Sequence, residues 1–124
     1  MTNVKKLRSN EIVQIVKLDS PEMTVYLMKM ANFAVRPYIT WLEANRVATY
    51  MRKVVDAIIQ KTTANKNLTG RDLVKIEPTT TTAGTFYFLT IADMDIRGYV
   101  EGYESLIDKN FFVDVVNEII KECQ

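Results

Sequence analysis

The chain has 124 residues, 48% of them apolar and 25% charged, and its formal net charge is +1. This composition is typical of one globular domain and excludes a disordered tail, a collagen-like fibre and a two-domain enzyme. The sequence contains no His, one Cys and four Gly, which removes Ser-His-Asp triads, His-ligated zinc sites and glycine-rich phosphate loops.

The first residues predict a soluble protein without a secretion signal. Residues 1–9 are basic and are expected to form a mobile arm. The apolar run that follows is broken by Gln14 and Lys17, and no apolar stretch approaches the ~20 residues needed to cross a bilayer. Because Cys123 has no second Cys to pair with, we predict a reducing compartment, a cytoplasmic location and no membrane partner.

Residues 11–18 are rich in β-branched side chains and predict a strand, with a helical turn as the alternative. Ser20 followed by Pro21 is typical of a helix start, so we predict a helix from there to about Phe33. Pro37 disfavours helical backbone before it and separates this helix from the next one.

Residues 38–61 carry apolar side chains at steps of three and four residues and predict a long core helix. The stripe expected to be buried comprises Ile39, Leu42, Val47, Tyr50, Met51, Val54, Val55 and Ile58. Residues 62–71 show no such periodicity, and their Asn and Gly residues predict a loop.

The second half predicts an antiparallel meander over residues 72–103. Two β-type runs, 72–77 and 85–92, are joined by a Thr-rich connection that we expect to be a mobile loop. After a tight turn at 93–95, residues 96–103 alternate strictly and predict a third strand.

A last helix is predicted from Asp108 or Asn110 to about Glu122. Its expected buried stripe is Phe112, Val115, Val116, Ile119 and Ile120. The predicted order is therefore β-α-α-β-β-β-α, with no internal repeat and no linker that would divide residues 1–124 into two domains. This order indicates an α+β fold in which helices cover one face of a sheet of three or four antiparallel strands. The other face must then be polar or be covered by a partner.

Residues 93–104 match part of the calcium-loop pattern. Carboxylates stand at the first, third, ninth and twelfth positions, which are Asp93, Asp95, Glu101 and Glu104. Arg97 stands at the fifth position, where an oxygen ligand is required, and the preceding residues predict a strand rather than a helix. A polar turn is therefore the favoured interpretation, and a calcium site or a magnesium-dependent hydrolytic site is the alternative.

An Arg/Tyr pattern is the main candidate for ligand binding. Arg97, Tyr99 and Tyr103 alternate along the predicted third strand, and Tyr87 lies on the strand before it. Side chains of these types on one sheet face can stack on bases and pair with phosphates. An amphipathic strand that covers neighbouring side chains or a dimer partner is the simpler explanation.

Charge is divided along the chain. Residues 1–66 have a net charge of +6 and residues 67–124 have −5. Arg46 and Lys53 form a basic stripe on the long helix, and the last helix carries an acidic one. Two solvated faces would explain this division, and contact between basic and acidic surfaces of separate copies is the alternative.

The sequence thus predicts a non-catalytic, cofactor-free binding protein that acts through an exposed sheet face and charged helices. The expected partners are further copies of the chain and another protein. Binding of a nucleic acid or nucleotide through the Arg/Tyr pattern, with the N-terminal basic arm, is the alternative. A carboxylate-dependent metal enzyme is a third hypothesis.

Overall fold

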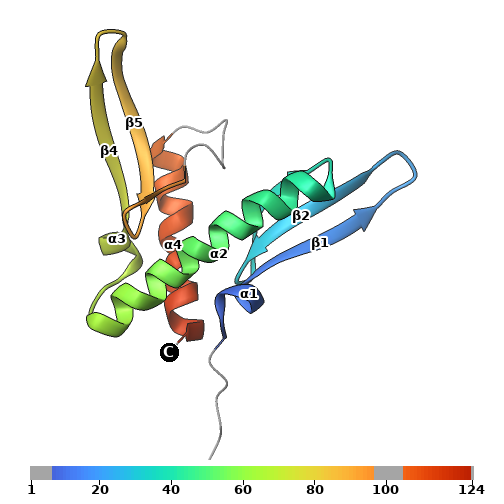
Figure 1. Ribbon diagram of the computed structural model, residues 1–124, viewed down its shortest axis with the longest axis horizontal. Coiled ribbons are helices and arrows are strands. Elements are labelled where there is room, and N and C mark those ends of the chain that lie inside the picture. Colours follow the sequence, from blue (N-terminus) through green and yellow to red (C-terminus); the bar gives the residue numbers. More distant parts are fainter. Residues whose placement is uncertain (1–6, 97–104, 124) are drawn as a thin grey trace, which may run out of the picture.

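The computed structural model describes residues 7–96 and 105–123, which form an α+β fold (Figure 1). In chain order its elements are α1 (Ser9–Ile12), β1 (Val13–Asp19), β2 (Thr24–Met30), β3 (Phe33–Tyr38), α2 (Trp41–Ala64), α3 (Gly70–Leu73), β4 (Val74–Thr81), β5 (Gly84–Ile91), β6 (Met94–Asp95) and α4 (Ser105–Cys123). None of the helices in these residues is long and apolar enough to span a membrane.

The strands form two antiparallel sheets, in the orders β1-β2-β3 and β4-β5-β6. Helix α2 contacts all three strands of the first sheet, α4 contacts β4 and β5, and the two helices contact each other. Buried residues of both sheets and both helices form one hydrophobic core. The hairpins β1–β2 and β4–β5 extend beyond this core in two directions as arms (Figure 1).

The predicted single sheet and the order β-α-α-β-β-β-α are wrong, because residues 21–33 do not form a helix. They form a turn, then β2 and the start of β3. The Ser20 hydroxyl does cap a backbone N–H, that of Met23 at 3.2 Å, but the Ser20 N–H donates back to the Met23 carbonyl at 2.9 Å. These two bonds close a hairpin turn. Pro37 is tolerated because it lies in β3, which is an edge strand of the sheet.

Two N-terminal predictions are confirmed with shifted boundaries. The strand at 11–18 is β1, preceded by the single turn α1, and the long helix is α2. Helix α2 begins at Trp41 because the Thr40 hydroxyl accepts from the Glu43 N–H at 3.2 Å. The burial predicted for Ile39 and Leu42 is wrong, since they are 72% and 74% exposed.

The predicted hairpin at 72–92 is confirmed as β4 and β5, but the Thr run is not a loop. Thr79 pairs with Phe86 and Thr81 with Gly84, so the strands extend almost to the tip. The third strand of this sheet, β6, lies at Met94–Asp95, where the turn at 93–95 was predicted. Of the strand predicted at 96–103, Ile96 is buried, and 97–103 lie outside the described residues. Helix α4 begins before Asp108, and four of its five predicted core residues are buried; Ile120 is half-buried.

The expectation of no internal repeat is also wrong. Each half contains a four-residue helix, a three-stranded meander and a long helix, and a shift of 61 residues superimposes the two sequences. The pairs that are identical under this shift are 2/63, 5/66, 7/68, 13/74, 15/76, 24/85, 26/87, 31/92, 36/97, 38/99, 43/104, 54/115, 55/116, 58/119 and 59/120. Several of them are core positions in both halves, which a chance match would not produce.

Candidate protein-binding surface

The structure places Tyr87, the one described member of the Arg/Tyr pattern, on the β4–β5 arm. Tyr87 shares its face of β5 with Leu89 and Ile91, which belong to the core. It is 54% exposed, and in Figure 1 the outer part of this arm extends past the helices. Tyr87 therefore lies on the helix side of its sheet rather than on the uncovered side. Arg97, Tyr99 and Tyr103 lie outside the described residues.

The repeat supplies a second copy of this pattern whose geometry is described. Tyr26, Arg36 and Tyr38 correspond in sequence to Tyr87, Arg97 and Tyr99. The Arg36 guanidinium carbon lies 5.2 Å from the centre of the Tyr38 ring, and Tyr26 is the cross-strand partner of Tyr38. Tyr38 is only 4% exposed. In the first half the pattern therefore makes a packing contact between the sheet and the core.

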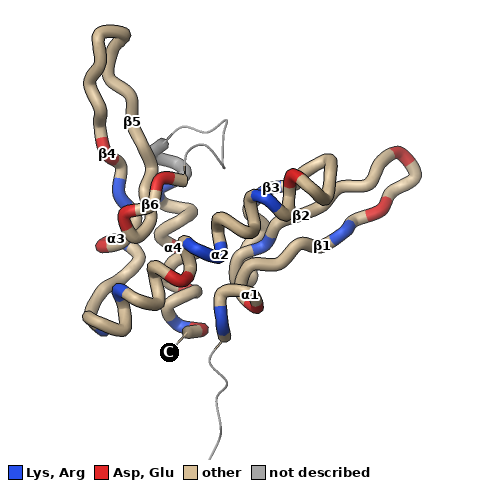
Figure 2. The backbone as a smooth tube through the Cα atoms, viewed as in Figure 1, with Lys and Arg blue, Asp and Glu red and all other residues tan. Residues whose placement is uncertain are grey.

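Arg46 and Lys53 are exposed on α2, as predicted, but Glu43 and Asp56 are exposed on the same helix. Figure 2 shows the resulting mixture of positive and negative positions along α2. The β4–β5 arm differs, because residues 78–92 contain no charged side chain. On α4, burial raises the pKa of Glu122, and the neighbouring carboxylate of Glu118 adds to the effect.

The acidic segment after β5, which contains Asp93 and Asp95, contacts α2. The Lys61 ammonium lies 2.7 Å from an Asp93 carboxylate oxygen, and this contact lowers the pKa of Asp93. The Tyr50 hydroxyl donates to the Asp95 carbonyl at 2.6 Å. Within residues 7–96 and 105–123, no three acidic or Cys side chains converge as metal ligands. Glu101 and Glu104, the other two predicted ligands, lie outside these residues.

A shallow pocket of about 560 Å³ lies where α1 meets the C-terminal parts of α2 and α4. Ser9, Asp56, Thr63 and Cys123 are among its lining residues. Burial, followed by the negative charge of Glu122, raises the pKa of the Cys123 thiol to about 11. Because a thiol in this state is protonated at neutral pH, Cys123 is not an activated nucleophile.

The main candidate surface is the outer face of the first sheet, which points away from α2. Alternation along the strands places Met28, Met30 and Tyr38 on the inner, buried face. The outer face consists of Gln14, Val16, Leu18, Val25, Leu27, Lys29, Ala34 and Pro37. Cross-strand pairing aligns Val16 with Leu27, Leu27 with Pro37, and Leu18 with Val25.

These aligned pairs form two adjacent apolar rows. The apolar side chains of the rows are not among those packed against the core, and Leu18 is 46% exposed. Exposed apolar residues continue past Pro37 into Ile39 and Trp41 at the start of α2. Leu18 and Pro37 are exposed, whereas Val16, Val25 and Leu27 are half-buried. A partly exposed apolar face of this kind is typical of a surface that binds another protein.

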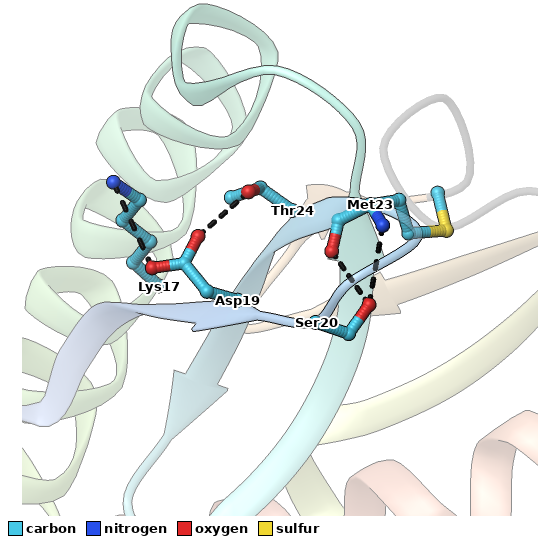
Figure 3. A network of polar contacts seen from close by, with 5 residues as sticks. All are labelled: Lys17, Asp19, Ser20, Met23 and Thr24. Atoms are coloured by element: carbon cyan, nitrogen blue, oxygen red, sulfur yellow. Dashed lines mark hydrogen bonds and ion pairs between the residues drawn. The ribbon is translucent and has the colours of Figure 1, made fainter.

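The two faces of the β1–β2 arm have opposite character. Figure 3 shows Lys17, Asp19 and Thr24 on the side of the arm that faces α2. The Thr24 hydroxyl donates to Asp19 at 2.6 Å, and the Lys17 ammonium lies 3.9 Å from the other Asp19 oxygen. At the tip, the Ser20 hydroxyl donates to the Met23 carbonyl at 2.8 Å. Hydrogen bonds and an ion pair thus stabilise the arm on the face toward α2, and Leu18 and Val25 lie on the opposite face.

The second sheet keeps apolar side chains at the corresponding places. Phe86 and Phe88 correspond to Val25 and Leu27 under the 61-residue shift, and they lie on the outer face of β5. Their cross-strand partners, Thr79 and Glu77, are polar. The fully apolar rows are therefore a property of the first sheet.

Sequence reasoning missed this surface because residues 21–33 were predicted to be helical. The signal that could have found it is the alternation of Val16 and Leu18 with Lys17 and Asp19. It is followed by Thr24, Val25 and Tyr26, which all favour strands. Comparisons with protein-family models, curated proteins and solved structures found no significant match to this chain. Its function is therefore inferred from its own geometry.

Proposed function

We propose that this protein is a non-catalytic binding protein that associates with protein surfaces, foremost further copies of itself, through the outer face of its first sheet. The observation that carries the proposal is the pair of apolar rows on that face, Val16–Leu27–Pro37 and Leu18–Val25. Fully burying an exposed leucine contributes about 1.5–3 kcal/mol. Leu27 is half-buried in the isolated chain, so burying it against a partner contributes only part of that amount. Several such residues together favour association, which single exposed apolar residues do not.

Measurement of the mass in solution tests the proposal. By light scattering, the wild-type protein is expected to be an oligomer and Leu27→Asp a monomer. The reason is that burying the new carboxylate in the interface, with no cation or hydrogen-bond donor to pair with it, is energetically costly. Thr80→Asp is the matched control, since it adds the same charge at an exposed position of the other arm. Circular dichroism should show both variants folded. An oligomer that survives Leu27→Asp would refute this surface.

Nucleic-acid binding through the Arg/Tyr pattern is the second candidate and has less support. The described copy of the pattern buries Tyr38 in the core, where no base can stack on it. The net charge of +1 also supplies little attraction for a polyanion. Fluorescence polarisation with a labelled single strand, at low salt, distinguishes the two candidates.

A further inference from the structure

The charged residues at the two ends of the apolar face are suited to one particular partner. Lys29 lies on the outer face at the base of β2, beside Gln14 and Ala34. Glu22 lies at the opposite end, in the turn at the tip of the arm, where it is exposed. In the part of the chain that the structure describes, neither side chain has an ion-pair partner. The apolar rows therefore lie between an unpaired cation and an unpaired anion.

We propose that the occupant of this face is a second copy of the chain, packed face to face across a two-fold axis with the two arms antiparallel. This inference rests on the proposed function and specifies its partner and geometry. Two identical faces can meet about an axis that lies in the interface plane. If that axis ran along the strands, Lys29 would face the same residue of the partner and Glu22 would also face its own copy. If the axis runs across the strands, each Lys29 faces a Glu22 of the other copy.

The antiparallel arrangement also aligns the apolar rows. Leu27 and Val25 lie between Glu22 and Lys29 along the chain, so an axis near these two residues places the row of Leu27 over the partner's row of Val25. The exposed Met23 next to the tip extends the apolar contact toward the partner's base. Face-to-face packing of two twisted sheets is a common way to bury such rows. The charges set the orientation, and the apolar rows supply most of the affinity.

Charge reversal tests the orientation separately from the surface. Lys29→Glu and Glu22→Lys each place like charges opposite one another twice in the dimer, and each is expected to weaken dimerisation about tenfold at low salt. The double variant Glu22→Lys/Lys29→Glu restores opposite charges and is expected to recover affinity to within about threefold of wild type. Lys66→Glu, at an exposed position after α2 and outside the face, is the control and should leave the dimer unchanged. Sedimentation velocity at low and high salt measures all five proteins.

The outcomes distinguish this inference from the proposed function. A wild-type dimer that Leu27→Asp dissociates, but that neither single charge variant weakens, would overturn the antiparallel arrangement and leave the surface in place. The antiparallel arrangement would also be overturned if each single charge variant weakened the dimer and the double variant did not recover the affinity. A wild-type protein that is monomeric at about 100 μM, a concentration at which interfaces of this kind associate, would overturn both.

Discussion

Ala31 and Ala92, 61 residues apart, occupy the same unusual position in the two halves of the molecule. Their φ angles are +54° and +50°, in the left-handed region. The Ala31 N–H donates to the Ile12 carbonyl and the Ala92 N–H donates to the Leu73 carbonyl, each at 3.0 Å. Ile12 and Leu73 are the last residues of the two short helices. The turn between the second and third strands is therefore tied to the start of the first strand in the same way twice.

This equivalence predicts equal sensitivity to β-branched substitution. Ala31→Val and Ala92→Val should each lower the free energy of unfolding by about 2 kcal/mol or more, because a β-branched side chain is strained at positive φ. Ala64→Val, at an exposed position with ordinary φ, should change stability by less than about 1 kcal/mol. Urea unfolding followed by circular dichroism measures the three. A large effect at one Ala and none at the other would argue against equivalent turns.

The two short helices, in contrast, should differ in how much a substitution at their equivalent first position lowers stability. The Gly70 N–H donates to the Asn117 side-chain oxygen at 2.7 Å, and a Cβ on Gly70 would overlap the Val113 carbonyl oxygen. Gly70→Ala should therefore destabilise the protein by about 2–3 kcal/mol, since the overlapping atom is backbone. Asn117→Ala should cost about 1–2 kcal/mol through the lost acceptor.

The control for this pair is Ser9→Ala. Ser9 is the equivalent of Gly70 and already carries a Cβ, so its substitution should change the unfolding free energy by less than about 0.5 kcal/mol. Thermal unfolding of the three variants provides an independent reading. Gly70→Ala with wild-type stability would contradict the close approach of α3 to α4.

The Lys61–Asp93 ion pair predicts a pH dependence. Its hydrogen bond and charge lower the pKa of Asp93 below the ordinary value of 3.8. A group whose folded pKa is lowered stabilises the fold above its unfolded pKa, and that contribution is lost as the pH falls through the folded pKa. The stability difference between wild type and Asp93→Asn should therefore be present at pH 7 and shrink below about pH 4. Urea unfolding at pH 7, 5 and 3 measures it; a difference that grows on acidification would contradict the sign.

We expect the Cys123 thiol to react slowly with alkylating reagents. With a pKa of about 11, little thiolate is present at pH 8. Iodoacetamide should label the native protein at least about tenfold more slowly than the urea-unfolded protein, whose thiol has an ordinary pKa near 8.5. Mass spectrometry of the labelled fraction over time gives both rates. Equal rates would show that the thiol is not buried against α1 and α2.

The division of charge has a different meaning once the repeat is known. The basic and acidic halves of the sequence are the two structural repeats, and Lys53 and Lys61 correspond to Asp114 and Glu122. These reversals hide the repeat from inspection of the sequence, because the surviving identities are confined mostly to core, turn and Arg/Tyr positions. Partner choice can differ between equivalent surfaces of the two halves for the same reason.

The sequence by itself determined the elements whose pattern is local. Apolar steps of three and four residues suffice for α2 and α4, because one stripe of each helix is buried. Runs of β-branched and aromatic residues bounded by turn residues suffice for β1 and the β4–β5 hairpin. The tertiary structure decided residues 21–33, where a helix start signal competes with strand pairing to residues on both sides. It also decided that Ile39 and Leu42 are exposed and that Val25 and Leu27 face outward. Apolar character shows that a residue can be buried, but only the arrangement of the other elements determines whether something covers it.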